Sequence, residues 1–323
     1  MGGVMRITAT LLLTLVLAAA ASAQSFPNKT IRILVGFAPG GSTDIVARLI
    51  AQKMTDNVGQ QVVVDNRPGA GGIIAAEILS KSPPDGYTMF ACTTGNFAII
   101  PYLYKTVPYN ADKDLVPVTQ TGSLPYIVDV HPSLPVKNIR EFIAFVKPRP
   151  GQINYASSGV GTASHLSAAY FASAAGLDLV HVPYKGTGNA MGDLLAGQVV
   201  MMFDQPVSSL PLIKAGKLKV LGISSGKRFP TLPDIPTIAE SGVTGFEAVS
   251  WSGMCVPGGT PKDIVNRLQV EIAKVLKLPD ITNRLMNDGI EPIGGTPAEF
   301  QAFIEREKIK WSKVVKDSGA RAD

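Results

Sequence analysis

Short aliphatic and β-branched runs alternate with glycine-opened helical segments along this chain, and this alternation constrains the fold more than any other feature. Residues 30–37, 61–65 and 87–92 predict buried strands, and the segments after Asp44 and at 73–80 predict the helices between them. Repeated strand–helix–strand units are typical of a parallel sheet that helices cover on both faces. The sequence therefore predicts a doubly wound α/β fold.

The alternation is interrupted once, and this interruption predicts two domains. Residues 116–130 contain two strand-like runs joined through 122–125 without a helix, and the alternation then restarts. Strand-like runs at 218–224 and 249–256 can return the chain to the first domain, where the C-terminal helices would pack. We expect two α/β domains joined by a two-segment hinge beside a cleft. The expected boundaries are 24–123 plus 225–323 for domain 1 and 124–224 for domain 2.

Residues 1–23 have the pattern of a secretory signal peptide. Arg6 supplies a positive start, residues 11–20 are apolar apart from one threonine, and Ala21-Ser22-Ala23 fits the small-residue cleavage rule. A membrane anchor is the alternative, but the apolar stretch is shorter than the roughly 20 residues that a spanning helix needs. We therefore expect export to the periplasm, with cleavage after Ala23.

The composition argues against several classes of protein. Hydrophobic residues make up 46% and charged residues 17% of the chain, so it can bury a core and is not intrinsically disordered. The net charge is +5, but Lys and Arg are scattered singly, which argues against nucleic-acid binding. The three histidines lack the spacing of metal ligands. We expect a monomer without a cofactor or a metal ion.

The loop after the first predicted strand is the most specific local signal. Its glycine pair permits a tight turn, and the hydroxyl and carboxylate residues that follow favour a helix start. Unpaired N–H groups and the positive end of the helix dipole can hold an anion there. An ordinary capped strand–helix connection is the alternative. The candidate ligand-binding residues of this loop are Phe37, Pro39, Gly40, Gly41, Ser42, Thr43 and Asp44.

Similar glycine-rich turns occur at 157–165 and 184–188 in the predicted second domain. Ligands of open α/β sheets bind beyond the carboxyl ends of the strands, where these turns lie. His165 has a second interpretation as a helix cap and Asp204 as a turn cap. The aromatic residues Phe37, Phe97, Phe203 and Trp251 either line the cleft or belong to the core. The further candidates are Thr93, Asn96, Ser157, Gly161, Thr162, His165, Tyr184, Lys185, Gly186 and Asp204.

A catalytic interpretation rests on Ser224, because residues 222–226 match the G-x-S-x-G pattern of serine hydrolases. A nucleophile of that kind leads into a helix, whereas here a Lys-Arg-Phe-Pro segment follows. A secreted hydrolase is therefore the weaker alternative.

Cys92 and Cys255 are the only cysteines, and an exported protein can keep a disulfide. Both fall on strands assigned to domain 1. Neighbouring parallel strands, however, rarely place their Cβ atoms suitably for a bridge. The sequence leaves the bridge open and favours free thiols.

Several ordered motifs together resemble the tripartite tricarboxylate transporter substrate-binding family, also called Bug proteins. The resemblance covers nearly the whole mature chain and is carried by residues 35–44, 64–72, 84–88, 155–165, 182–186 and 257–261. It implies a type II periplasmic-binding-protein architecture, no catalysis, and a small carboxylate ligand delivered to a membrane permease. A ligand-sensing partner of a membrane signalling protein shares this fold and stays an alternative.

The family resemblance also implies how the ligand is held. Backbone amides, hydroxyls and ordered waters of the first strand–helix loop and the facing loops bind the carboxylate in the family. Asp44 is then expected to orient its loop rather than meet the anion. One departure is the segment Phe37-Ala38-Pro39, where family members often carry another proline. The residues carried over are Gly40, Gly41, Ser42, Thr43, Asp44, Ser157, Gly161, Thr162, His165, Tyr184, Lys185 and Gly186.

Overall fold

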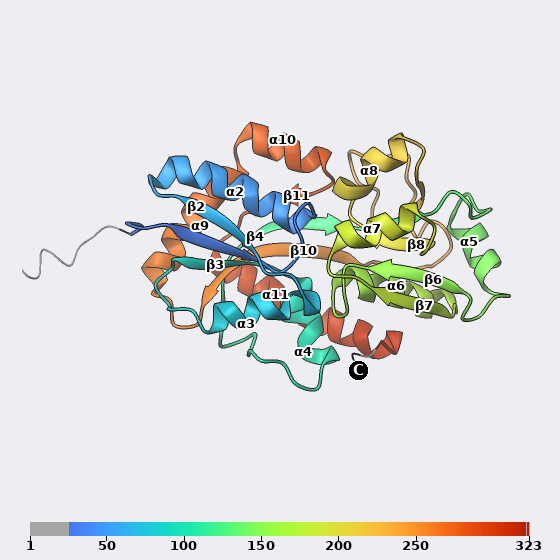
Figure 1. Cartoon of the computed structure of the whole chain (residues 1–323), viewed down its shortest axis with the longest axis horizontal. Helices are drawn as coiled ribbons and strands as arrows, with labels where there is room; N and C mark the ends of the chain where they lie inside the picture. The colour runs from blue at the N-terminus through green and yellow to red at the C-terminus, as the bar shows by residue number, and fades with distance from the viewer. Residues whose placement is uncertain (1–25, 321, 323) are drawn as a thin grey trace, which may run out of the picture.

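Two β-sheets lie one after the other along the long axis of the molecule (Figure 1). The computed structural model describes residues 26–320 and residue 322, and the predicted signal peptide lies outside them. Within the described residues, none of the helices combines the length and the apolar character that a membrane crossing requires.

The first sheet has six strands in the order β11-β4-β10-β3-β1-β2. Their bounds are β1 Ile31–Val35, β2 Val62–Asn66, β3 Thr88–Thr93, β4 Leu115–Pro125, β10 Val249–Pro257 and β11 Glu291–Pro292. Strands β1, β2 and β3 are parallel, whereas β10 lies antiparallel between β3 and β4. The purely parallel sheet expected from the sequence is wrong in this respect, because β10 enters the sheet from the second domain and not from a crossover helix.

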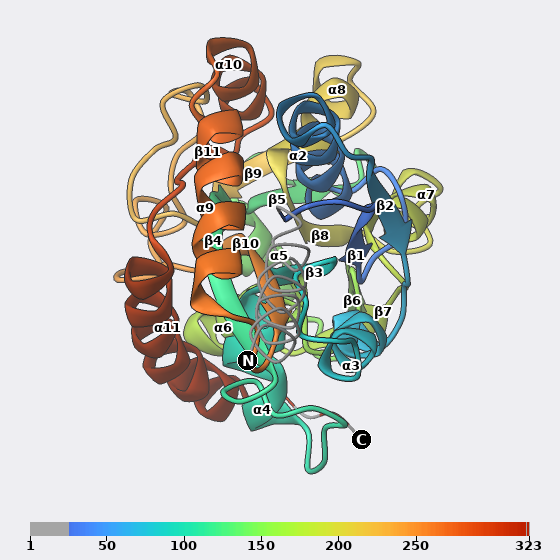
Figure 2. The same ribbon diagram turned by 90° about the vertical axis from the view of Figure 1, so that its left-hand side faces the viewer.

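Helices cover both faces of the first sheet, as Figure 2 shows from its end. One face packs α2 (Ser42–Val58), α9 (Lys262–Leu276) and α10 (Pro279–Asn287) into an aliphatic core. The other face packs α3 (Ile73–Ser80), η2 (Gly95–Ile99), α4 (Ile100–Leu103) and the first half of α11 (Pro297–Ser318). A short turn, η1 (Ala70–Gly72), precedes α3. The sheet therefore has the two-faced cover that the alternation predicts.

The second sheet has five strands in the order β7-β6-β8-β5-β9. Their bounds are β5 Ile127–Val130, β6 Ile153–Ser157, β7 Leu179–Pro183, β8 Met201–Asp204 and β9 Lys219–Ile223. Strand β6 is parallel to β7 and β8, whereas β5 is antiparallel to β8 and β9. The helices of this domain are α5 Ile139–Val146, α6 Ala163–Ala175, α7 Thr187–Leu195 and α8 Pro206–Lys214. Helices α4 and α8 were not anticipated from the sequence.

Local sequence signals set several helix ends. Thr296 and Glu299 form a reciprocal capping box at the start of α11, which satisfies backbone N–H groups that the helix leaves unpaired. Helices α2 and α11 end at Gly59 and Gly319, whose φ angles of 67° and 65° are left-handed and favour glycine. These ends depend on neighbours along the chain and not on contacts with distant residues.

The chain crosses between the sheets twice, and the two crossings are hydrogen-bonded to each other. Tyr126 joins β4 to β5 at the first crossing, Ala248 precedes β10 at the second, and Ser224 follows β9 in the second domain. The Ser224 hydroxyl accepts from the Tyr126 N–H at 2.8 Å and donates to the Ala248 carbonyl at 2.6 Å. Ser224 is fully buried, so the nucleophile interpretation is wrong: its hydroxyl already has both partners and joins the two crossing segments.

The return to the first sheet comes later than residue 225. Ile238, Val243 and Phe246 belong to the core of the second domain, so residues 225–248 pack there before β10 begins. The predicted joint at 122–125 lies inside β4. Helix α11 spans both domains, with Phe300 in the first core and Trp311 in the second.

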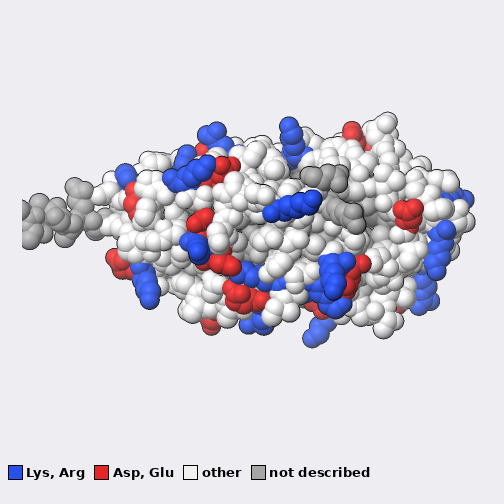
Figure 3. Space-filling view, turned by 90° about the horizontal axis from the view of Figure 1, so that it is seen from below, with Lys and Arg blue, Asp and Glu red and all other residues white. Residues whose placement is uncertain are grey.

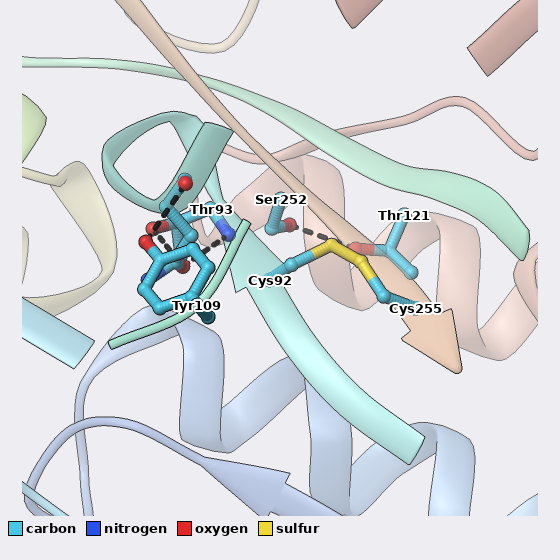
Figure 4. The surroundings of a disulfide bond; sticks show 7 residues. Cys92, Thr93, Tyr109, Thr121, Ser252 and Cys255 are labelled. Atoms are coloured by element: carbon cyan, nitrogen blue, oxygen red, sulfur yellow. Dashed lines mark hydrogen bonds between the residues drawn. A yellow bond between two sulfur atoms is a disulfide. The ribbon is translucent and has the colours of Figure 1, made fainter. Parts of the chain in front are cut away.

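Cys92 and Cys255 form a disulfide between β3 and β10 (Figure 4). The two strands are antiparallel, and the Cα atoms lie 6.3 Å apart. The expectation of free thiols is wrong because it assumed parallel neighbours. The bridge joins residues 163 positions apart in the sequence, directly beside Thr93.

Candidate functional site

A cavity of about 50 Å³ lies between the two domains, where strand ends and helix starts of both sheets meet. Its lining consists of uncharged residues, although basic and acidic side chains are interspersed over the outer face drawn in Figure 3. Any charge on a ligand must therefore be balanced by dipoles and hydrogen bonds. The described lining residues are Phe37, Ala38, Gly41, Ser42, Thr43, Thr93, Leu124, Tyr126, Ser158, Thr162, Ala163, Thr187, Gln205, Ser250, Trp251 and Ser252.

Four helices begin at this cavity, one from the first domain and three from the second. Helices α2, α7 and α8 start after Gly41, Gly186 and Gln205, and none of these residues caps its helix with a side chain. At α6 the Thr162 hydroxyl accepts the N–H of His165 at 3.3 Å. The uncapped starts of α2 and α7 present free N–H groups and partial positive charge, so the cavity favours an anion without any cationic side chain. Helix α8 begins with Pro206, which has no N–H, and contributes its helix dipole alone.

Most of the polar side chains in the lining carry hydroxyl groups. Hydrogen bonds to neighbouring side chains hold several of these hydroxyls in place (Figure 4). The Thr93 hydroxyl donates to the Asn96 side-chain oxygen at 3.0 Å. The Ser252 and Thr121 hydroxyls lie 2.8 Å apart. Such anchored hydroxyls can bind a polar ligand without first having to be ordered.

The two domains touch directly across the cavity. Ser42, in the first turn of α2, hydrogen-bonds through its hydroxyl to the side-chain oxygen of Gln205, which precedes α8. This contact links the start of α2 in the first domain to the start of α8 in the second, across the cavity.

Glycines allow the backbones of the two domains to approach closely beside the cavity. A Cβ atom on Gly95 would lie 2.9 Å from the carbonyl oxygen of Gly161, and one on Gly186 would lie 3.3 Å from the backbone nitrogen of Ala38. The first of these distances is shorter than real Cβ contacts. The approach seen here therefore depends on the missing side chain at Gly95.

Trp251 contributes an aromatic surface to the cavity and is also part of the core. Its indole N–H donates to the Glu307 carboxylate of α11 at 3.1 Å, and the same oxygen accepts the indole N–H of Trp311 at 2.8 Å. The two interpretations left open for Trp251 therefore both apply. Phe97 and Phe203 are buried core residues instead.

Six of the residues singled out from the sequence line the cavity, and others lie directly behind it. The six are Phe37, Gly41, Ser42, Thr43, Thr93 and Thr162. Asn96 holds Thr93, as described above, and Gly186 precedes α7. Asp204 lies one step deeper, where it accepts from the Thr187 hydroxyl at 3.3 Å.

Asp44 holds the loop before α2 in place through hydrogen bonds to its carboxylate. Its carboxylate accepts from the Gly40 N–H at 3.0 Å, the Arg48 guanidinium at 2.9 Å and the Asn66 amide at 2.9 Å. Burial acts to raise the pKa of Asp44, but these hydrogen bonds outweigh it and hold the pKa below its ordinary value. The Gly40 N–H is therefore used inside the loop.

His165 and Ser157 face away from the cavity. The His165 ring stacks on His181 with centroids 3.9 Å apart, and the Ser157 hydroxyl lies 2.6 Å from the Nε2 atom of His181. Burial, followed by the neighbouring His181, lowers the pKa of His165 to about 3, so the ring is neutral near pH 7. Both histidines line a separate cavity beside the end of α11.

The remaining candidates also lie elsewhere. Tyr184 donates its hydroxyl to Asp193 at 2.6 Å, and Gly161 packs against Ile100 of the first domain. Pro39, Gly40 and Lys185 are exposed. Among the described residues, no group of three or more His, Cys, Asp or Glu side chains could hold a metal ion.

Nine lining residues were not named from the sequence as possible ligand contacts, for two different reasons. Thr187 and Ser158 adjoin predicted loop residues, so their place at a helix start or turn is a usable signal. Tyr126 and Ser250 come from the crossing segment and from β10, which only the sheet pairing brings to the cavity. The nine are Ala38, Leu124, Tyr126, Ser158, Ala163, Thr187, Gln205, Ser250 and Ser252.

Known proteins share both the sequence and the fold. Protein BugT of Bordetella pertussis is 35% identical, with 94% of each chain covered. The structure of Rpa4515 from R. palustris with adipate has a TM-score of 0.90 and 37% identity, covering 92% of this chain and 99% of the other. MatC from Rhodopseudomonas palustris with bound malate has a TM-score of 0.86 and 33% identity, covering 90% and 100%.

The family assignment rests on a match over most of the chain. The tripartite tricarboxylate transporter family receptor, TctC, matches residues 46–320, which leave out β1 but include every other strand and, in full, three of the four helix starts at the cavity. Members of this family are solute-binding receptors and not enzymes, in agreement with the buried, doubly bonded hydroxyl of Ser224. The chain therefore belongs to the tripartite tricarboxylate transporter receptor family, whose members include the Bug proteins.

Proposed function

We propose that this protein is an exported receptor that captures one small carboxylate in the cavity between its domains. The observation that carries the proposal is the convergence of four helix N-termini on a cavity without charged lining residues. Such a cavity stabilises an anion through backbone N–H groups and hydroxyls. The adipate and malate in the structures of two relatives support a carboxylate as that anion.

The lining suggests how the ligand is oriented. Backbone N–H groups of Ser42, Thr43 and Thr187 bind the carboxylate oxygens, while the ring of Trp251 contacts the ligand body. We include in the proposed binding site the lining residues that were not predicted from the sequence.

A thermal-shift screen over mono-, di- and tricarboxylates tests the proposal. A ligand at 100 times its dissociation constant is expected to stabilise the folded state by about 2.7 kcal/mol. Sugars and amines of similar size serve as controls and should leave the melting temperature unchanged. No shift with any carboxylate would contradict the proposal.

We further propose that the domains close on the ligand by a hinge at the two crossing segments. The Tyr126–Ser224–Ala248 hydrogen bonds hold these segments together while the sheets rotate about them. Because only the closed form satisfies the carboxylate from both sides, ligand binding shifts the equilibrium toward it. Small-angle scattering should show a smaller radius of gyration with ligand, and an unchanged radius would favour a rigid pocket.

Delivery of the ligand to a membrane permease completes the proposed role, with the family assignment as its support. Residues 1–23 are expected to be removed as a signal peptide during export, so mass spectrometry of the secreted protein should find Gln24 at its N-terminus. Retention of the apolar residues 11–20 would contradict cleavage. Uptake of the bound carboxylate should stop when either the receptor or its permease is deleted.

A further inference from the structure

Two carboxyl groups are buried together in the second domain, directly behind the cavity. Asp129 of β5 and Asp204 at the end of β8 are 0% and 2% exposed. The hydroxyl of Ser209, on α8, hydrogen-bonds to Oδ2 of Asp129 and lies 3.0 Å from Oδ2 of Asp204. A hydroxyl donates only one proton, so the second of these hydrogen bonds needs a proton on a carboxyl group. The geometry therefore requires one of the two acids to be neutral.

Asp129 is the neutral member of the pair. Its Oδ1 atom is buried without a hydrogen-bond partner, which an ionised carboxylate does not tolerate. Burial, followed by the neighbouring Asp204, raises the pKa of Asp129 well above its ordinary value. Asp204 instead accepts hydrogen bonds from Thr187 and Ser209 as well as from the backbone of Gln205. Burial still raises the pKa of Asp204 to about 6, against these hydrogen bonds.

Asp204 is separated from the cavity by a single layer of side chains. Thr187, which donates to its Oδ1 atom at 3.3 Å, lines the cavity, and so do Gln205 and Tyr126. An anion in the cavity would therefore lie close to an ionised Asp204 in a poorly solvated region. Like charges at short range favour the protonated form of the carboxyl group.

Other ionisable groups around Asp204 do not supply a compensating charge. Burial raises the pKa of Tyr126, so this residue stays neutral near pH 7. Helix α6 directs His165 against His181. The basic residues beside α7 and at the end of α8, Lys185 and Lys214, are exposed. Asp129 and Tyr126 are thus the ionisable groups that face Asp204 among the described residues.

We propose that Asp204 is a proton-binding site coupled to the cavity, so that the receptor takes up a proton when it binds its carboxylate. This inference rests on the proposed function, because it needs an anion in the cavity. Its consequence is that affinity for the carboxylate rises as the pH falls from 8 toward 6, where simple aliphatic dicarboxylates are still largely ionised.

Calorimetry in two buffers of different ionisation enthalpy tests the coupling. Adipate and malate are titrated into the whole mature protein at pH 6.5, and the buffer dependence of the heat gives the number of protons taken up. Because the pKa of Asp204 is about 6 in the free protein, a rise of this pKa on binding should give uptake of a fraction of a proton at pH 6.5 and an affinity that is severalfold higher at pH 6 than at pH 8.

Two variants identify the group. Asp204→Asn should abolish the buffer dependence and flatten the affinity between pH 6 and pH 8. Asp129→Asn, the matched control, replaces an already neutral group and should keep the uptake. Equal heats in both buffers for the unmodified protein, or uptake that survives Asp204→Asn, would overturn the inference while leaving carboxylate binding intact. No binding heat with either acid would refute the proposed function for these ligands, and the coupling with it.

Discussion

Replacing Gly95 by alanine is expected to weaken carboxylate binding through the contact between the domains. A Cβ atom at this position would lie 2.9 Å from the carbonyl oxygen of Gly161 across the cleft, below any ordinary contact distance. The backbone of Gly95 is not left-handed, so alanine fits its local conformation. Relief of the clash requires the two backbones to move apart. Overpacking of this kind costs about 1–3 kcal/mol, which corresponds to an increase in Kd of about 5- to 150-fold.

Calorimetry with the most strongly stabilising carboxylate measures this loss, and the melting temperature of the ligand-free protein shows whether the fold is intact. Gly188→Ala is the matched control, because its Cβ would lie 4.0 Å from the carbonyl oxygen of Pro39, also across the cleft and at an ordinary distance. The control should bind as tightly as the unmodified protein. A folded Gly95→Ala variant with unchanged Kd would show that the Gly95–Gly161 approach is not needed for binding and would refute the reasoning.

Four further outcomes are expected. Gly41→Val places a branched side chain at the start of α2 in the cavity lining and should reduce affinity at least about 100-fold by calorimetry, with an unchanged melting temperature. Replacing Cys92 and Cys255 together by alanine removes a link across 163 residues and should lower the free energy of unfolding in urea by up to about 5 kcal/mol, whereas the unmodified, unreduced protein should show no free thiol after denaturation. Trp311→Phe leaves Trp251 as the single tryptophan, and its emission should change on ligand binding, while Trp251→Phe should abolish that change. Folding lowers the pKa of Asp44 below its ordinary value of 3.8. The ionised Asp44 carboxylate therefore stabilises the fold above pH 3.8, and this stabilisation is lost as the pH falls through the lower pKa of the folded state. Asp44→Asn should reduce the acid dependence of the free energy of unfolding below about pH 4.

In the first domain, the helix and strand ends that were predicted correctly are those specified by residues close to them in the sequence. Both ends of the helix Ile73–Ser80 and the start of the strand at Ile31 were predicted to within one residue. Hydrophobic periodicity and glycine or hydroxyl residues specify these positions. The loop before α2 was also identified as a cavity wall from its glycines and its helix start. Short-range steric and hydrogen-bonding preferences are sufficient for features of this kind.

The candidate site was predictable only in part, for a physical reason. Residues such as Ser42 and Thr162 begin helices after strands, and that position is visible in the sequence. Asp44 orients its loop, as expected, whereas the stacking of His165 on His181 turns that ring away from the cavity. The competition between a ligand and an internal partner depends on distances that no local pattern contains.

By itself, the sequence determined the two-domain α/β class, most helix and strand positions, the family and the loops from which the cavity is built. Only the tertiary structure decided that β10 runs antiparallel beside β3, so that Cys92 and Cys255 are bridged and Trp251 reaches the cavity. It also decided that Ser224 joins the crossings and that Asp129 and Asp204 share the hydroxyl of Ser209. These features depend on strand pairing between residues far apart in the chain, and such pairing is selected by the packing of the whole molecule rather than by any local run of residues.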